Sequence, residues 1–416
     1  MKKFIEEHEL EVLLIIITMF GISRWWIPSV MGFEKTYAAS QWVLSYSYGL
    51  IRRGLVGTVM KVWLPILTIK DIHDTALIAY CTFLVFLLVV FYFLLRYKDK
   101  SGQLFRLILF FLACPATISM IANNLGRFDL FLTIIIFLSL TLLSFNRYVW
   151  LIPILMITAM FIHEGFLILY APTILAAMIF VYLWNKREKR ILVTLVFSAI
   201  SVGAAFFVLY RYGCPVLGYE EFSRFIQARS TFSITELSIR ECFFNINNHY
   251  ELASSTLYDA GSIANLFLAL LILSPAILIL LNLWSHALKK CGAQRSACWL
   301  FFLATLSALI GVPIATDYGR WLSAIIFCNF FAFFFFVSRG IINVEELTEY
   351  KGGSFRLLFV SIILTYLLFG PFHDCNPYPY RDNLIFSSFF IISVLFFDVG
   401  FYLRWRSLSK ATYSGE

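Results

Sequence analysis

Charge is scarce in this sequence. Only 14% of its 416 residues are Asp, Glu, Lys or Arg, whereas a soluble domain usually contains about 25%. Hydrophobic residues make up 60% of the chain, and Phe alone occurs 45 times. No stretch between the long apolar runs is long enough for a separate folded domain of ordinary size. The composition therefore excludes a soluble globular protein and predicts a single integral membrane domain over residues 1–416.

Several motifs of soluble enzymes are also missing. The chain has no Gly-rich phosphate loop and no Gly-x-Ser-x-Gly nucleophile elbow, and its six His residues show no zinc-ligand spacing. The net charge of +8 comes mostly from short loops, without the alternation of basic and aromatic residues that a nucleic-acid groove needs. We therefore expect no nucleic-acid partner, no metal site and no cofactor. A divalent cation held by carboxylates stays open, although no paired-carboxylate motif requires one.

Apolar segments long enough to cross a bilayer follow one another along the chain. A bilayer core needs roughly 20 apolar residues per helix. The first segment is long and ends in Trp25 and Trp26, which is typical of an uncleaved span and not of a signal peptide. We therefore predict an all-α polytopic fold with about twelve transmembrane helices. They are expected near residues 12–30, 75–96, 104–122, 128–145, 148–163, 165–184, 191–211, 262–283, 297–315, 321–338, 356–371 and 383–403.

Every second loop between these segments is short and basic. The positive-inside rule places those loops in the cytoplasm, together with both termini of a multi-pass protein of the bacterial inner membrane. Two larger loops, 31–74 and 212–261, are then periplasmic. Residues 54–69 are apolar, but the segment is short and contains Lys61 and Pro65, so we interpret 31–74 as a loop with interfacial helices. Cysteines in the second loop, Cys214 and Cys242, are candidates for a disulfide or for two thiols.

Polar clusters that topology does not require lie at the outer ends of the predicted helices. The candidate catalytic carboxylates are Glu34, Asp129, Glu164 and Asp317, the candidate phosphate-binding residues are Arg52, Arg53, Arg127 and Arg320, and His163 is a further candidate. Arginine offers fixed bidentate donors to phosphate oxygens, and a carboxylate can accept a proton from an attacking hydroxyl. Together the clusters favour a polar cavity, open to the outside, that accepts a lipid-linked sugar phosphate.

Each cluster also has a purely structural interpretation. Arg127 with Asp129, or Asp317 with Arg320, could close a tight turn as a local ion pair. The adjacent Arg52 and Arg53 could anchor lipid headgroups, and His163 could be an ordinary buried histidine.

The layout of the chain resembles the GT-C superfamily of membrane glycosyltransferases. The resemblance lies in a long first outer loop with the acidic Glu34 just past the first span, many spans with short basic inner loops, and a second large outer loop. Size and layout are similar to the phage-encoded O-antigen glucosyltransferases of serotype conversion. This resemblance implies transfer of a sugar, expected to be glucose, from undecaprenyl phosphate to the O-antigen of lipopolysaccharide in the periplasm. Glu34 matches the family's first-loop acid, usually Asp, and is the first candidate for general base, ahead of Asp129 and Glu164.

Two other functions stay open. An O-antigen polymerase, which joins undecaprenyl-diphosphate-linked repeat units to a lipid-linked oligosaccharide, has a similar size and span count, and His163-Glu164 resembles some of these proteins. The long first loop favours the transferase. A transporter of lipid-linked saccharides is the third alternative, but transporters place charges near the bilayer midplane, whereas residues 130–143 carry none. The sugar, its linkage, its acceptor and the oligomeric state are not specified by these patterns.

Overall fold

The computed structural model describes residues 33–99, 102–185, 187–243, 260–312, 318–344 and 391–403, with isolated positions 360, 362, 363, 366 and 406. Within these ranges the chain folds into helices and turns, with two isolated β-bridges and no β-strand. The predicted all-α fold is therefore confirmed for the described part of the chain. The predicted span at 12–30 and most of the one at 356–371 lie outside it.

Six helical stretches of the described chain are long and apolar enough to cross a membrane. They are Ile69–Lys98 (α5), Gln103–Asn123 (α6, Gln103–Ala113, and α7, Ile118–Asn123), Lys189–Tyr212 (α12), Leu266–Lys290 (within α16, Ala260–Lys290), Gly292–Gly311 (which contains α17, Arg295–Thr305) and Tyr318–Ser338 (α18). Shorter apolar helices are Gly54–Trp63 (α4), Asp129–Phe145 (α8), Val149–Ile162 (which contains α9, Ile152–Ile162), Ala171–Trp184 (α11) and Ile391–Leu403. Each predicted span from 75–96 to 321–338 overlaps one of these helices.

Local chemistry explains where the observed helices depart from the predicted spans. Helix α5 begins at Ile69, earlier than expected, because Thr68 and Asp71 form a capping box. The Asp71 amide donates to the Thr68 hydroxyl over 3.1 Å, and the Thr68 amide donates to the Asp71 carboxylate over 2.9 Å. The predicted helix 104–122 is interrupted between α6 and α7 at residues 114–117, where Pro115 cannot donate to the helical ladder.

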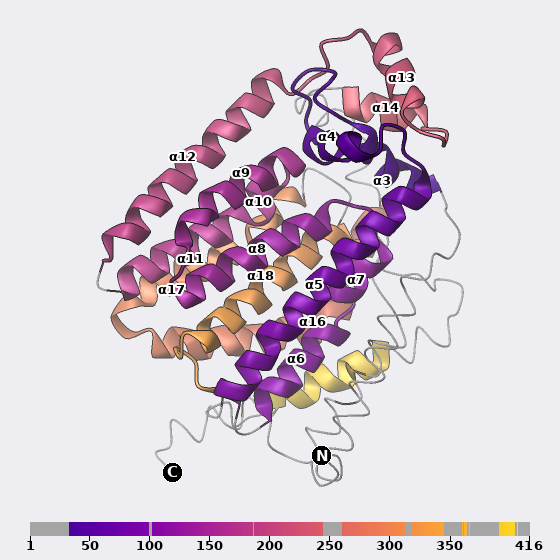
Figure 1. Cartoon of the computed structure of the whole chain (residues 1–416). Helices are drawn as coiled ribbons and strands as arrows, with labels where there is room; N and C mark the ends of the chain where they lie inside the picture. The colour runs from indigo at the N-terminus through magenta and orange to yellow at the C-terminus, as the bar shows by residue number, and fades with distance from the viewer. Residues whose placement is uncertain are drawn as a thin grey trace, which may run out of the picture.

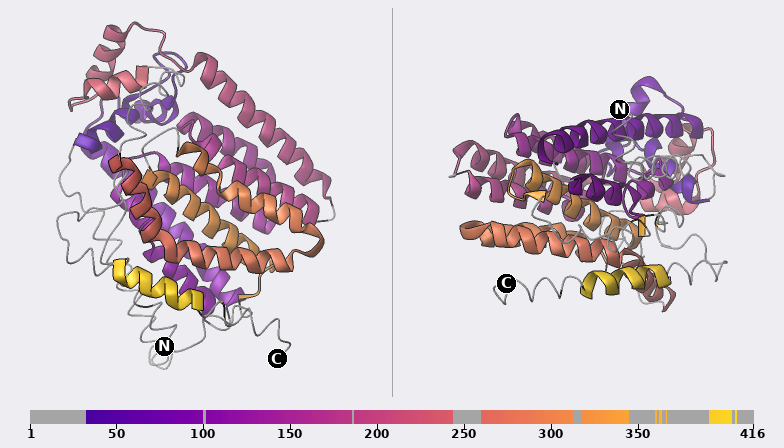
Figure 2. Two further views of the ribbon diagram at one scale, coloured as in Figure 1. Left: turned by 180° about the vertical axis from the view of Figure 1, so that it is seen from behind. Right: turned by 90° about the horizontal axis from the view of Figure 1, so that it is seen from below.

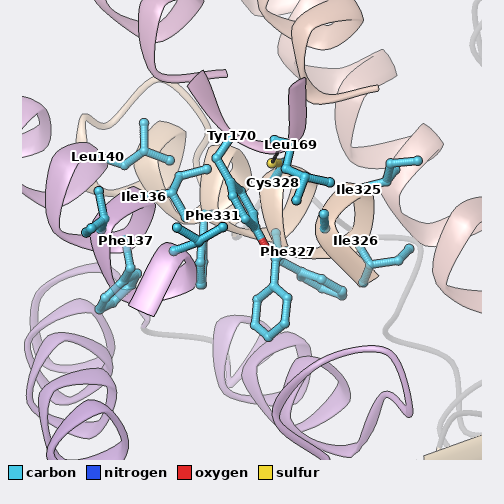
Figure 3. Close-up of a cluster of buried hydrophobic side chains, with 14 of the residues drawn as sticks. Ile136, Phe137, Leu140, Leu169, Tyr170, Ile325, Ile326, Phe327, Cys328 and Phe331 are labelled. Atoms are coloured by element: carbon cyan, nitrogen blue, oxygen red, sulfur yellow. Dashed lines mark hydrogen bonds between the residues drawn. The ribbon is translucent and has the colours of Figure 1, made fainter. Parts of the chain in front are cut away.

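Helix α18 forms the centre of the bundle. Every residue from Leu322 to Val337 is buried, as expected for a helix that is apolar all round. Phe331 of α18 packs on Phe137 of α8 with ring centroids 4.9 Å apart, and Figure 3 shows this contact beside Phe327 and Tyr170. Helix α12, in contrast, buries only one stripe and lies at the outside of the bundle (Figure 1).

Helix α16 is bent along its length (Figure 2). Pro275 lies inside it, and an internal proline removes a backbone hydrogen bond and kinks a helix. Close to this point, the hydroxyl of Ser274 contacts the carboxylate of Asp398 in the helix Ile391–Leu403. The bend therefore occurs where α16 meets the last described helix.

The two large loops of the predicted topology meet at one end of the bundle. Figure 1 shows α3 (Phe33–Val43) and α4 from the first loop beside α13 (Tyr219–Ala228) and α14 (Glu236–Phe243) from the second. The buried Arg229 connects them, because its guanidinium donates to the carbonyl oxygen of Val43 over 2.6 Å. Leu67 and the 229–231 backbone exchange two further hydrogen bonds of 2.8 and 3.0 Å. No disulfide joins Cys214 to Cys242, both of which are described.

Helix α4 is held against the chain that precedes it by a glycine. A Cβ at Gly57 would overlap the backbone carbonyl oxygens of Trp42 and Leu44, so only glycine permits this approach. The opposite edge of α4 is apolar and exposed, with Val62 and Trp63 more than 70% accessible. Ten residues make a helix of about 15 Å, which is too short to span a bilayer. The interfacial position of this helix stays a prediction.

Candidate functional site

Residues predicted as site candidates converge at the end of the bundle that carries α3 and α4. Those that interact with one another are Arg52, Arg53, Asp129, His163, Glu164 and Arg320. They come from the turn before α4, the connection after α9, and the first turns of α8 and α18. The structure groups them into two arginine–carboxylate pairs with a histidine between.

The first pair joins Arg53 to Glu164, 111 residues later. The Arg53 Nε lies 3.1 Å from both carboxylate oxygens, and Nη2 lies 2.7 Å from Oε1. Arg52 adds a weaker contact, with Nη1 at 3.5 Å from the same Oε1. The side chains of Arg53 and Glu164 are only 13% and 12% exposed, and that of Arg52 is 2% exposed. A buried forked pair of this kind is among the stronger ionic contacts in proteins.

The backbone at Arg53 adopts a left-handed conformation, with φ of 60°. Such a conformation is uncommon for a residue other than glycine, and it is often found at functional positions. Neighbouring side chains of an extended chain point to opposite sides. The left-handed turn is thus what allows Arg52 and Arg53 to reach one carboxylate.

The second pair joins Asp129 to Arg320, 191 residues later. Arg320 Nε lies 3.0 Å from Oδ2 and Nη2 lies 3.1 Å from Oδ1 of the aspartate. The local pair of Arg127 with Asp129, considered from the sequence, does not form this contact, and the pair of Asp317 with Arg320 is untested because Asp317 lies outside the described structure. Arg127 acts on Asp129 only as a nearby charge, and the hydrogen-bonding arginine comes from another helix.

His163 lies between the two pairs. Its Nδ1 accepts a hydrogen bond of 2.9 Å from the amide of Gly165 and lies 3.8 Å from Glu164 Oε2. Burial, followed by the charge of Arg53, lowers the pKa of His163 to about 3, while the carboxylates of both pairs oppose this shift. The imidazole is therefore neutral at neutral pH. With Nδ1 as the acceptor, its proton is on Nε2.

Glu164 is held in its ionised form. Burial alone would raise the pKa of Glu164, but the charges of Arg53 and Arg52 hold it well below its usual value. A carboxylate with so low a pKa accepts protons poorly while these partners remain. Any role of Glu164 as a base therefore requires Arg53 to change partner.

A cavity of about 20 Å³ lies beside the second pair. Polar groups that line it include Asp129, Arg320, Thr133, Tyr170 and Ser323. It has room for about one water molecule, so the described conformation has no sugar-sized space here. Tyr170, Thr133 and Ser323 were not predicted as site residues, because isolated hydroxyls in apolar helices give no distinctive sequence signal.

Three predicted residues are not part of these contacts. The backbone of Glu34 belongs to α3, but its side chain lies outside the described structure, and so does Asp317. Arg127 is described and is only partly buried. Within the described ranges, no group of three or more His, Cys, Asp or Glu side chains is placed to hold a metal ion.

Trp42 was missed by sequence reasoning. Its indole nitrogen donates to the carbonyl oxygen of Gly126 over 2.6 Å and thereby fastens α3 to the turn before α8. Tryptophan is common at membrane interfaces, so its presence in the first outer loop gives no distinctive sequence signal.

Comparison of the chain with protein-family models, with curated proteins and with solved structures finds no match.

Proposed function

We propose that this protein is a membrane glycosyltransferase with a GT-C-like arrangement of about twelve spans. It transfers a sugar, expected to be glucose, from undecaprenyl phosphate to the O-antigen of lipopolysaccharide. In this proposal the protein lies in the bacterial inner membrane with both termini in the cytoplasm and its site in the periplasm. The observation that supports it is the convergence of two buried arginine–carboxylate pairs and a neutral histidine at one end of an apolar helix bundle.

The donor phosphate binds where Arg52 and Arg53 now hold Glu164. A phosphate presents oxygens that match the guanidinium fork as well as a carboxylate does. The polyprenyl tail then lies against the apolar helices, and the sugar faces His163 and the second pair. Binding exchanges the partner of Arg53 from Glu164 to the phosphate.

This exchange prepares the base. Once Arg53 has turned to the phosphate, burial raises the pKa of Glu164 and allows it to accept a proton. An acceptor hydroxyl oxygen attacks the anomeric carbon of the sugar, and its proton passes to the Glu164 carboxylate. The bond from the anomeric carbon to the phosphate oxygen breaks, and undecaprenyl phosphate leaves with the electron pair. The arginines stabilise the charge on the departing phosphate.

Among the described carboxylates, Glu164 is preferred because its partners, Arg52 and Arg53, are the adjacent pair assigned to the phosphate. Asp129 is likewise held on both of its oxygens, but by Arg320 of another helix. Glu34 and Asp317 stay as alternative bases, since the resemblance favours Glu34.

Glu164→Gln tests the assignment in cells with a defined O-antigen. The substitution keeps the shape and removes the base, so modification of the O-antigen should fall by about 10² to 10⁴-fold. Glu188→Gln is the matched control, because Glu188 also pairs with an arginine, Arg190, but belongs to the N-terminus of α12 at the other end of the bundle. Mass spectrometry of the O-antigen and immunoblots of the membrane fraction measure activity and accumulation. Full modification by Glu164→Gln would exclude Glu164 as the general base and leave Glu34, Asp129 and Asp317 as candidates.

O-antigen polymerase is the second candidate function. The observation that favours it is the placement of a buried histidine, His163, next to a carboxylate held by two arginines. The two functions predict different lipopolysaccharide in cells that lack this protein. Loss of a transferase removes a sugar branch, whereas loss of a polymerase leaves lipopolysaccharide with a single repeat unit.

A further inference from the structure

A larger cavity lies at the opposite end of the same helices. It has a volume of about 240 Å³. It is lined by the C-terminal halves of α5, α8 and α18, and its lining includes Phe93, Lys98, Thr141, Ser144, Phe145 and Phe335. Along α8, Asp129 of the candidate site and Phe145 of this cleft are separated by about 24 Å at 1.5 Å per residue. The cleft is thus distinct from the site described above.

The walls of this cleft consist mainly of apolar side chains. Its serine and threonine hydroxyls donate within their own helices: Thr141 to the Phe137 carbonyl over 2.7 Å, Ser144 to the Leu140 carbonyl over 2.8 Å and Ser338 to the Phe335 carbonyl over 2.8 Å. Phe93 and Phe145, on its two sides, are 45% and 63% exposed. In a membrane protein, apolar residues exposed on the outer surface of a bundle face lipid. The cleft therefore suits a hydrocarbon chain that enters from the bilayer.

The mouth of the cleft is basic. Lys98 lines it and is exposed, and its Nζ reaches the end of α18, 3.6 Å from the position of a Cβ on Gly340. Next to Gly340, the guanidinium of Arg339 stacks over Phe335 at 5.9 Å. Its Nε and Nη2 are buried and have no hydrogen-bond partner among the described residues.

The acidic residues near this mouth, Asp99 and Glu188, bind groups outside the cleft. None of the described residues that line the cleft is acidic. Asp99, which follows Lys98, accepts a hydrogen bond of 3.0 Å from the amide of Phe105 in α6. Glu188 attracts Arg339 only through its charge, since its carboxylate binds Asn146 and Arg190. Among the described residues that line the cleft, Lys98 is the charged one.

We propose that this cleft binds one acyl chain of an anionic glycerophospholipid, with the lipid phosphate at Lys98. The apolar walls accommodate the chain, and the basic mouth selects lipids with a negative headgroup. The predicted topology places this end of α5 at the cytoplasmic leaflet, where anionic lipids attract basic residues. The inference does not depend on the proposed enzyme activity, because it uses the other end of the bundle.

Native mass spectrometry of the purified full-length protein tests the proposal. The protein in detergent is incubated with phosphatidylglycerol or with phosphatidylcholine of the same acyl chains, and bound lipid is measured. We expect about fivefold stronger retention of phosphatidylglycerol, since one basic residue near a lipid phosphate contributes about 1 kcal/mol. Lys98→Gln should abolish this preference. Arg96→Gln is the matched control, because Arg96 lies on the same turn of α5 but does not line the cleft.

A second variant separates the chain from the headgroup. Ser144→Phe places a ring in the cleft and should lower retention of both lipids by a similar factor. Thermal unfolding of each variant verifies that it is folded. If Lys98→Gln does not fold, the retention of both lipids by Ser144→Phe tests the proposal instead. Equal retention of the two lipids by the wild type would overturn the proposal, as would equal losses in Lys98→Gln and Arg96→Gln. Displacement of phosphatidylglycerol by a polyprenyl phosphate would also overturn it.

Discussion

Removing Arg53 should destabilise the protein far more than removing a comparable arginine at its surface. Arg53→Met leaves the carboxylate of Glu164 buried, with Arg52 at 3.5 Å as its remaining arginine partner. Loss of one partner from a buried ion pair costs about 3–5 kcal/mol. The remaining arginine places the expected cost near the lower limit, at about 3 kcal/mol. Arg190→Met is the control, because Arg190 also pairs with a glutamate, Glu188, at 2.9 Å, but its side chain is 53% exposed. Surface pairs contribute about 0–1 kcal/mol.

Equilibrium unfolding in mixed detergent micelles measures these differences. A double-mutant cycle with Glu164→Gln should recover part of the loss, because the double variant leaves no unpaired carboxylate. We expect a coupling free energy of about 1–3 kcal/mol between the two positions. Equal effects of Arg53→Met and Arg190→Met on stability, or a cycle without coupling, would show that the Arg53–Glu164 pair does not stabilise the fold.

Three further predictions concern pH, packing and topology. Because the pKa of His163 falls to about 3 in the folded protein and the pKa of Glu164 is also lowered, the unfolded chain binds more protons in acid. Stability should be highest above about pH 6.5 and should decline as the pH falls toward 3, a dependence that His163→Gln should weaken in unfolding titrations. Gly57→Ala should destabilise the protein through its overlap with backbone oxygens, whereas Gly203→Ala, in open space on α12, should be neutral or stabilising by up to about 1 kcal/mol; equal melting temperatures would contradict this. Reporters fused after residues 100, 190 and 290 should be cytoplasmic and one fused near residue 230 periplasmic; residues 190 and 230 on one side would show that the span count is wrong.

The helices were largely predictable from hydrophobicity, and their ends were not. The apolar run from Leu130 to Leu143 predicts a helix at 128–145, and α8 is observed at Asp129–Phe145. Helix α5 begins earlier than its apolar run because the Thr68–Asp71 capping box continues it into a polar segment. Capping chemistry acts over three residues, whereas a hydropathy window averages over about 19.

The candidate site was predictable as a set of residues but not as a set of contacts. Topology alone places Arg53, Asp129, Glu164 and Arg320 at the same ends of their helices. Their pairing depends on which helices are neighbours, and the sequences of apolar helices carry no pattern that identifies a neighbour. The local pair of Arg127 with Asp129 was the natural expectation, yet α18 supplies the partner. Arg229 was overlooked for a related reason: loop arginines are usually solvated, and its carbonyl acceptors are 164 to 186 residues away.

Reconstitution tests most directly the proposal that this protein transfers a sugar from a lipid phosphate. The purified protein is placed in liposomes with an O-antigen acceptor and either undecaprenyl-phosphate-linked glucose or the corresponding nucleotide sugar. We expect a single-hexose increase in acceptor mass with the lipid-linked donor only. This increase should be lost in Arg53→Met and Glu164→Gln and retained in Glu188→Gln. Transfer from the nucleotide sugar, or transfer from the lipid-linked donor that survives both substitutions, would contradict it.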